Sequence, residues 1–289
     1  MYKEHKIGGV ILAYNEENHI KDTIETLPGF IDKIYVIDDG SPDRTAEIVT
    51  TITDQRIRLI QHEVNKGPGA ALVTGYKATL NDEVDVIVKM DGDNQMDPDQ
   101  LPNMLDPIIE GRADYTKGNR LLSPEYRSGM TKWRFFGNSI LTLLTKIGSG
   151  YWQLMDPQNG YTAISGHALG RISLDSVYPY YGYLNDILVK LNVYGYRVMD
   201  IVMPARYGKE KSSIKYSKYI VKVSFLLLRN FFWRLKMKYV VFSFHPLVLF
   251  YMLGIVLTPI GFLGGLFVLY SKYILGTSLF VRGTLSLLV

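Results

Sequence analysis

The chain has 289 residues, of which 47% are hydrophobic and 21% are charged, so it can bury a substantial core and is not intrinsically disordered. Its formal net charge of +4 is small, but lysine and arginine are concentrated between positions 206 and 238, which indicates contact with phosphates or an anionic surface. The sequence contains no cysteine, which excludes disulfide bonds and thiolate metal sites.

Strand-like and helix-like segments alternate along the first part of the chain. Runs of β-branched and apolar residues predict strands, and apolar residues at helical spacing predict the helices between them. This alternation predicts an α/β fold whose mostly parallel sheet is covered by helices on both faces. The predicted strands are 7–13, 33–37, 57–61 and the run from Val86, and the predicted helices are 17–27, 41–52 and 69–80.

An acidic segment follows the last of these strands. Residues 86–98 read Val-Ile-Val-Lys-Met-Asp-Gly-Asp-Asn-Gln-Met-Asp-Pro, so a buried strand is expected to deliver carboxylates to the sheet edge where α/β proteins bind ligands. Asp91 and Asp93 lie two residues apart, and Gly92 lets the backbone turn both toward one point. They suit Mg²⁺ or Mn²⁺ completed by water and nucleotide phosphates. The alternative is an ordinary turn, with residues 97–98 starting a helix.

Two earlier loops at strand ends are also acidic. Ala-Tyr-Asn-Glu-Glu at 13–17 follows the first strand, and Asp-Asp-Gly-Ser-Pro-Asp at 38–43 follows the second. Each loop alone is typical of a turn with a helix cap, in which Ser41 caps a helix that begins at the next residue. Three acidic loops at one edge instead favour a nucleotide, whose ribose hydroxyls and base N–H groups can donate to Asp38 or Asp39.

The glycine-rich segment 67–72 superficially resembles a dinucleotide-binding fingerprint, because it follows a strand and opens a helix. Leu72 replaces the third glycine, and the segment does not lie in the first βαβ unit, so a nicotinamide or flavin cofactor is not predicted. Asn65, Lys66 and Gly67 are instead candidates for lining the nucleotide pocket through side chains and backbone N–H groups.

As an ordered set, these loops resemble those of family-2 glycosyltransferases, which have the nucleotide-sugar-binding GT-A fold. The matching segments are 10–17, 36–45, 65–75 and 90–98. Leu12 stands where a proline is common in the family, and Gly92 and Asn94 replace commoner neighbours of the aspartates. The resemblance implies nucleoside contacts at Ala13, Tyr14, Glu16 and Asp39, and contacts to a metal on the donor diphosphate at Asp91, Asp93 and Gln95.

The middle of the chain resembles, more narrowly, the polyprenyl-phosphate glycosyltransferases, a group that includes dolichyl-phosphate mannose synthases. The resemblance implies that Gln158 and Asn159 line the donor-sugar pocket. The alternative to a binding role for Arg134 is that its side chain snorkels from the core face of an apolar helix. The matching segments are 118–120, a helix from 133 to 147, 156–161, 183–186 and 206–213, and the residues implied in binding the acceptor phosphate are Arg120, Arg134, Arg206, Lys211 and Ser212.

The C-terminal part predicts attachment to a membrane. Residues 246–270 carry no charged side chain, and a helix of that length spans the ~30 Å hydrocarbon core. Residues 214–238 mix aromatic and basic side chains, which predicts a helix lying in the headgroup layer on the cytoplasmic side. Residues 279–289 are apolar but too short to cross, and could begin a second span. The expected parts are a cytoplasmic catalytic domain (1–213), a juxtamembrane amphipathic helix (214–240) and a transmembrane region (241–289).

The N-terminal residues run into the first strand without an apolar stretch of signal-peptide length, which also predicts a cytoplasmic catalytic domain at the cell membrane. The expected activity, by resemblance, is metal-dependent transfer of a sugar, with inversion, from a donor such as GDP-mannose or UDP-glucose to a polyprenyl or dolichyl phosphate. A hydroxyl acceptor would instead need a carboxylate base, for which Asp186 is the candidate by resemblance. A catalytically silent nucleotide-sugar binder is a third interpretation, and no nucleic-acid partner is predicted.

Overall fold

The computed structural model describes residues 1–121, 132–204 and 216–276, with only the backbone described at 132–136, 138 and 216–219. The chain divides into two compact units, Met1–Arg234 and Leu235–Val289.

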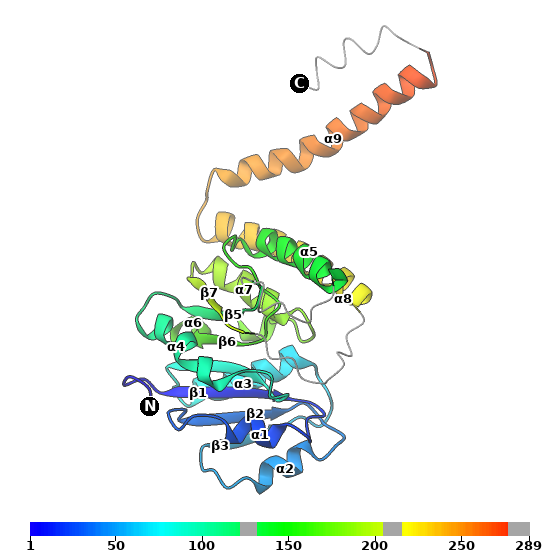
Figure 1. Ribbon diagram of the computed structural model, residues 1–289. Helices are drawn as coiled ribbons and strands as arrows, with labels where there is room; N and C mark the ends of the chain where they lie inside the picture. The colour runs from blue at the N-terminus through cyan, green and yellow to red at the C-terminus, as the bar shows by residue number, and fades with distance from the viewer. Residues whose placement is uncertain (122–131, 205–215, 277–289) are drawn as a thin grey trace. The chain divides into compact units, whose positions relative to one another are not determined.

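The first unit is built on a twisted sheet (Figure 1), which has seven strands within the described residues. The strand order is β3-β2-β1-β4-β6-β5-β7, and β6 runs antiparallel to its neighbours β4 and β5 while the other pairs are parallel. The mostly parallel sheet predicted from the sequence is therefore confirmed. The strands are β1 (Ile7–Ala13), β2 (Lys33–Asp38), β3 (Ile57–Gln61), β4 (Val86–Asp91), β5 (Tyr115–Asn119), β6 (Thr162–Ser165) and β7 (Val198–Val202).

Helices cover both faces of this sheet. Along β1, Val10 and Leu12 pack into one apolar cluster with helix α3, whereas Ile11 and Ala13 pack into a second cluster with helices α1 and α4. Because successive side chains of a strand point to opposite faces, a strand buried on both sides must be apolar throughout, as β1 is. The α-helices are α1 (Ile20–Glu25), α2 (Thr45–Thr51), α3 (Pro68–Asn81), α4 (Leu101–Ile109), α5 (Lys132–Ser149), α6 (Gly166–Arg171), α7 (Tyr183–Val193), α8 (Tyr216–Lys236) and α9 (Leu247–Tyr273), with short helical turns at Pro98–Gln100, Leu174–Ser176 and Met237–Val241.

Helix α2 begins later than the sequence suggests. The cap expected at Ser41 is not formed, because the Ser41 hydroxyl oxygen instead accepts a hydrogen bond from the backbone N–H of Asn15 at 3.1 Å. The side chain of Asp43 accepts hydrogen bonds from the backbone N–H and the hydroxyl of Thr45, where the helix starts. The loop after β2 is therefore tied to the loop after β1.

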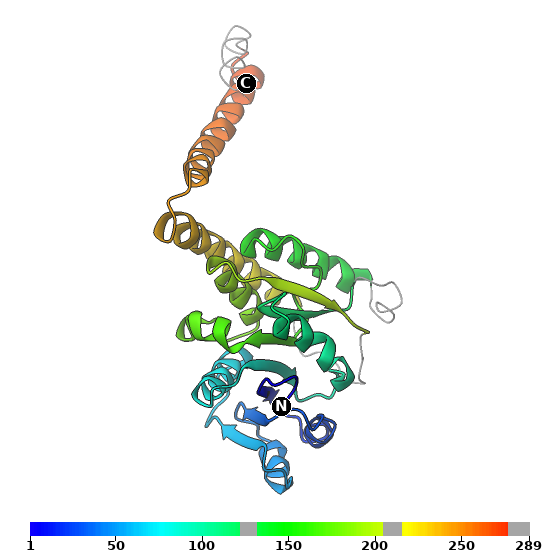
Figure 2. The ribbon, with the colours of Figure 1, turned by 90° about the vertical axis from the view of Figure 1, so that its left-hand side faces the viewer.

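Helices α5 and α8 lie side by side (Figures 1 and 2), and Leu141, Val223 and Leu227 are buried between them. On the opposite side of α8, the exposed residues Val221, Phe225, Leu228 and Phe232 recur at helical spacing. The helix predicted at 214–238 is thus present, with one face packed on the rest of the first unit. Its placement in a headgroup layer stays a prediction.

The second unit contains α9, the one helix in the described residues that is long and apolar enough to cross a membrane. It runs from Leu247 to Tyr273, so it includes almost all of the predicted span at 246–270. At about 1.5 Å per residue its length exceeds the ~30 Å hydrocarbon core. The apolar stretch at 279–289 lies outside the described residues.

Candidate active site

Three acidic loops meet at one edge of the sheet. The parallel register pairs Ala13 with Asp38 and Leu12 with Asp91, so β1, β2 and β4 end at the same level. The backbone N–H of Asp39 donates to the Ala13 carbonyl at 2.9 Å, which fixes the first two loops together. The sheet edge predicted from the sequence is therefore present, and carboxyl ends of this kind are where open α/β sheets bind ligands.

Asp39 is buried at this edge, and its carboxylate joins two loops. It accepts hydrogen bonds from the backbone N–H groups of Lys66 and Gly67 at 2.9 and 2.8 Å. Nδ1 of His62 lies 2.7 Å from the same carboxylate, and Nε2 of His62 lies 2.9 Å from the Thr74 hydroxyl. These contacts hold the β3–α3 loop against the end of β2, so Asp39 shapes the predicted nucleotide pocket as well as being one of its candidate ligands.

The other predicted nucleoside contacts differ in exposure. Ala13 and Asp38 are buried, whereas the Tyr14 side chain is 45% exposed. Glu16 is half-buried and Lys66 is exposed. A ligand at this edge can therefore reach the side chains of Tyr14 and Lys66 directly, whereas one carboxylate oxygen of Glu16 is buried.

Asp91 and Asp93 provide the carboxylates of the predicted metal site. The Asp91 side chain is 37% exposed, and Asp93 Oδ1 accepts a hydrogen bond from the backbone N–H of Gln95 at 3.1 Å. Over residues 1–121, 132–204 and 216–276, no group of three or more His, Asp or Glu side chains is placed to hold a metal ion. The two carboxylates fit Mg²⁺ or Mn²⁺ in their chemistry, but the ion would need further oxygen ligands from water and a nucleotide diphosphate.

A buried lysine lies beside these carboxylates. The Lys89 side chain is fully buried, and its Nζ lies 2.5 Å from Asp91 Oδ1. Gly160 packs against both groups, since a Cβ atom at that position would lie 2.7 Å from Asp91 Oδ2 and 2.8 Å from Lys89 Nζ. Sequence analysis missed Lys89 and Gly160, although a charged residue inside an apolar strand is a detectable signal.

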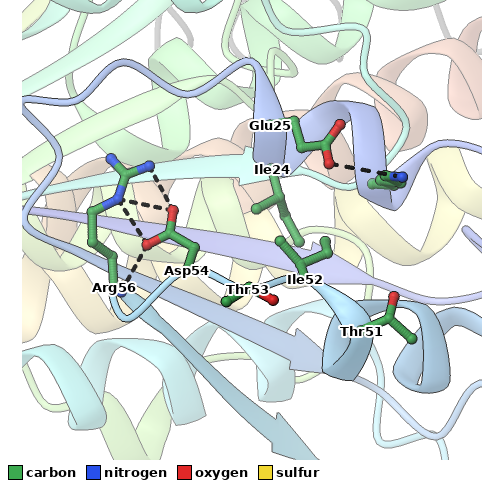
Figure 3. A pocket seen from close by; sticks show the side chains of 8 residues that line it. Ile24, Glu25, Thr51, Ile52, Thr53, Asp54 and Arg56 are labelled. Carbon is green, nitrogen blue, oxygen red and sulfur yellow. Dashed lines mark hydrogen bonds and ion pairs between the residues drawn. The ribbon is translucent and has the colours of Figure 1, made fainter.

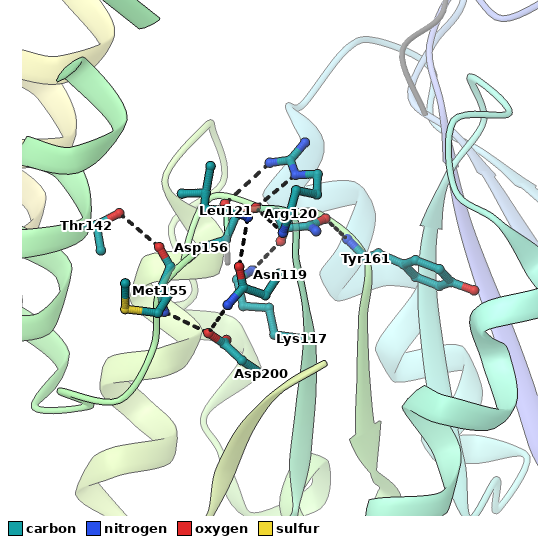
Figure 4. A network of polar contacts seen from close by, with 10 residues as sticks. Lys117, Asn119, Arg120, Leu121, Thr142, Met155, Asp156, Tyr161 and Asp200 are labelled. Atoms are coloured by element: carbon teal, nitrogen blue, oxygen red, sulfur yellow. Dashed lines mark hydrogen bonds and ion pairs between the residues drawn. The ribbon is translucent and has the colours of Figure 1, made fainter. Parts of the chain in front are cut away.

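Figure 4 shows the polar network around Arg120 at the end of β5. The Arg120 Nε lies 2.8 Å from the carboxylate of Asp156, whose side chain is 2% exposed against 26% for Arg120. Lys117 donates to the Asn159 carbonyl, and burial lowers the pKa of Lys117 to about 7. Strand pairing puts Lys117 beside Asp200, and burial raises the pKa of the Asp200 carboxyl. The network fixes the orientation of Arg120 at the sheet edge.

Asp186, the candidate base, is buried and accepts three hydrogen bonds. Nζ of Lys190 and the side-chain amide of Asn230 each lie 2.7 Å from its carboxylate, and the backbone N–H of Tyr178 lies 2.9 Å away. The Asp186 side chain is 2% exposed. These contacts are those of a structural ion pair within α7, which the Asn230 hydrogen bond joins to α8, and a role as general base stays a prediction.

Gln158 and Asn159 lie in the segment before β6. Asn159 is buried, and its side-chain oxygen accepts a hydrogen bond from the Tyr161 backbone N–H at 3.0 Å. Gln158 is half-buried, and its amide donates to Asn185 at 3.3 Å. Asn159 therefore stabilises this segment, whose contact with a sugar stays a prediction. The predicted phosphate ligands outside the described residues are the Arg134 side chain, Arg206, Lys211 and Ser212.

A pocket (Figure 3) lies between α1 and the loop that joins α2 to β3. Within it, Arg56 pairs with Asp54 at 2.7 Å. None of the predicted site residues lines this pocket, so the carboxyl edge remains the candidate active site. The lining residues are Lys21, Ile24, Glu25, Thr51, Ile52, Thr53, Asp54 and Arg56.

The sequence is similar to a known family. A family model described as "Glycosyl transferase family 2" matches residues 10–176. A UDP-N-acetylglucosamine–dolichyl-phosphate N-acetylglucosaminyltransferase of Methanococcus voltae is 32% identical over 57% of this chain and 71% of its own length. An undecaprenyl-phosphate mannosyltransferase of Micrococcus luteus is 27% identical over 66% of this chain and 80% of its own length. A dolichol-phosphate mannosyltransferase of Pyrococcus furiosus is 28% identical over 64% of this chain and 53% of its own length.

The fold is similar to that of solved structures. Glucosyl-3-phosphoglycerate synthase from Mycobacterium tuberculosis, in complex with Mn²⁺, UDP and phosphoglyceric acid, superposes with a TM-score of 0.62. The match covers 79% of both chains at 22% sequence identity. The same enzyme with Mg²⁺ and UDP gives a TM-score of 0.61 at 22% identity, over 80% of this chain and 79% of the enzyme.

Proposed function

Because the chain belongs to glycosyltransferase family 2 and has the GT-A fold, we propose that it transfers a sugar from a nucleotide-diphosphate sugar to a polyprenyl phosphate. The observation that carries the proposal is the sheet edge where Asp91 and Asp93 lie with the loops after β1 and β2. The names of the lipid-phosphate glycosyltransferases to which the chain is similar support the acceptor class.

We place the donor across the loops that follow β1, β2 and β4. Tyr14, Glu16 and Lys66 line the nucleoside part, and Asp91 and Asp93 hold Mg²⁺ or Mn²⁺ on the diphosphate. When bound, the metal supplies a Lewis acid that offsets the charge developing on the departing diphosphate. The complexes of a protein of the same fold with UDP and Mn²⁺ or Mg²⁺ support this assignment.

The acceptor phosphate reaches C1 of the sugar from the other side. With a second pKa of about 6, a phosphate monoester is an anionic nucleophile at neutral pH, so its oxygen can form the new bond to C1 as the bond to the diphosphate breaks. That single in-line displacement inverts the sugar at C1. The protein must position and neutralise the phosphate, and Arg120, held by Asp156, is the described residue suited to it.

The proposal predicts a sugar-linked polyprenyl phosphate as the product. Membranes containing the protein, given a polyprenyl phosphate and labelled nucleotide sugars one at a time, should transfer label to the lipid fraction from one donor. Mild acid should release the label, because the product is a glycosyl phosphate. Label that appears only in an oligosaccharide or a glycolipid without phosphate would contradict a lipid-phosphate acceptor.

We also propose that α9 crosses the cell membrane, with the catalytic unit on the cytoplasmic side. Because the natural sequence has no cysteine, a single cysteine at the exposed position of Lys21 can be labelled specifically. A membrane-impermeant maleimide is expected to label it only after the cells are opened. Labelling in intact cells would contradict this orientation.

A further inference from the structure

Lys89 forms an ion pair with one carboxylate of the predicted metal site. It lies on β4 two residues before Asp91, and its Nζ is 2.5 Å from one oxygen of that carboxylate. Its side chain has no solvent exposure, although the Asp91 side chain is 37% exposed. One carboxylate oxygen of the candidate metal ligand is therefore already in contact with a cation.

The surroundings confine this ammonium group to its position. Lys89 pairs with Thr162 across the antiparallel ladder of β4 and β6, and its Nζ lies 5.9 Å from the centre of the Tyr183 ring. A Cβ at Gly160 would lie 2.8 Å from Nζ, so the backbone closes directly over the ion pair. Because the group is shielded from water, its charge acts strongly on ligands bound at Asp91.

We propose that Lys89 sets the charge of the donor site, so that a divalent cation binds weakly by itself and is retained when it arrives with a diphosphate. This inference rests on the proposed function, because it assumes that Asp91 and Asp93 hold the metal. The Lys89 ammonium offsets the charge of the Asp91 carboxylate with which it pairs. The ammonium repels the cation and competes for Asp91, whereas it attracts the negatively charged diphosphate.

Replacing Lys89 by a neutral residue should therefore raise the affinity for the metal ion and lower the affinity for the nucleotide. In Lys89→Met, which keeps the length of the side chain, Mn²⁺ should bind in the absence of nucleotide about tenfold more tightly. UDP or GDP should bind in the absence of metal about tenfold more weakly, for the same electrostatic reason. Damage to the fold would weaken both, so a strengthened metal site together with a weakened nucleotide site identifies an effect of charge.

The test uses the full chain purified in detergent. Free Mn²⁺ is measured by electron paramagnetic resonance without nucleotide, and binding of UDP and of GDP is measured by calorimetry in the presence of chelator. Lys89→Gln, a neutral residue that can still donate to Asp91, should behave like Lys89→Met. The matched control is Lys33→Met, which removes a lysine paired with Asp82 at 2.8 Å at the start of β2, and it should change neither affinity.

The outcomes separate this inference from the proposed function. If Mn²⁺ binds wild-type protein with UDP or GDP, and Asp91→Asn abolishes that binding, the metal site is supported. Lys89 variants with unchanged affinities, or with both affinities weakened, would then overturn the role of Lys89 alone. If wild type and Asp91→Asn bind Mn²⁺ and nucleotide equally, the metal site is wrong and the inference about Lys89 falls with it.

Discussion

Asp91→Asn is expected to abolish sugar transfer, and also to lower the melting temperature because it leaves the buried Lys89 with only a neutral partner. Asparagine has nearly the same shape, but it removes the negative charge that would hold the metal at the end of β4. A metal acting as a Lewis acid is worth several kcal/mol of transition-state stabilisation, so a loss of ~4 kcal/mol corresponds to about a thousandfold lower rate. The measurement is transfer from the active nucleotide sugar at saturating donor and Mg²⁺. Asp93→Asn should reduce transfer by a similar factor.

The control is Asp85→Asn. Asp85 immediately precedes the first residue of β4, whereas Asp91 is its last residue. Asp85 accepts a hydrogen bond from the Lys6 backbone N–H at 2.8 Å and lies far along β4 from the candidate site. It should keep near-normal transfer, and the melting temperature of Asp93→Asn should stay close to that of wild type, so that loss of transfer in Asp93→Asn is not a loss of fold. Full activity in both Asp91→Asn and Asp93→Asn, or activity that a chelator does not reduce, would contradict the metal assignment.

The arrangement of the sheet edge could be predicted from the sequence because it depends on local patterns. Apolar runs that stop at Ala13, Asp38 and Asp91 mark strand ends, and parallel strands bring such ends to one level. Helix boundaries were less predictable. At Ser41 the hydroxyl has two possible roles, as a cap for the next helix or as an acceptor for Asn15, and only the tertiary structure decides between them.

The polar contacts between residues far apart in the sequence could not be predicted from local patterns. Asp156 is 36 residues from Arg120 along the chain, and their ion pair depends on the fold that brings the end of β5 next to the segment before β6. Lys117 meets Asp200 only because β5 and β7 pair in one register. The burial of Asp186 likewise follows from contact with Asn230 on α8, a helix read from sequence as a membrane-surface element. A motif identifies candidate residues, whereas the packing around each carboxylate decides what it can do.

The acceptor class can be tested by comparing Arg120 with Asp186. If the acceptor is a lipid phosphate, Arg120→Ala should lower kcat/KM by roughly tenfold to a hundredfold, since a hydrogen bond to a charged group contributes about 1.5–3 kcal/mol. Arg120→Lys should restore this only partly, because lysine lacks the bidentate guanidinium. Arg134→Ala, at another predicted phosphate ligand, should show a loss of the same order. Because Arg120→Ala leaves the buried Asp156 carboxylate without its cation, each variant is measured per folded protein for transfer to polyprenyl phosphate and, separately, for donor binding, which should be unchanged.

Asp186→Asn should lower the stability of the protein and leave the rate of sugar transfer nearly unchanged. It leaves Lys190 buried with only a neutral partner, so thermal or denaturant unfolding should show destabilisation of about 3 kcal/mol or more. The folded fraction should still transfer sugar at a near-normal rate, because a phosphate nucleophile needs no general base. Loss of a true base would typically lower the rate by about 10² to 10⁴ without affecting stability. A stable Asp186→Asn protein that binds donor but cannot transfer it, beside near-normal Arg120→Ala and Arg134→Ala proteins, would establish a hydroxyl acceptor and reject the lipid-phosphate mechanism.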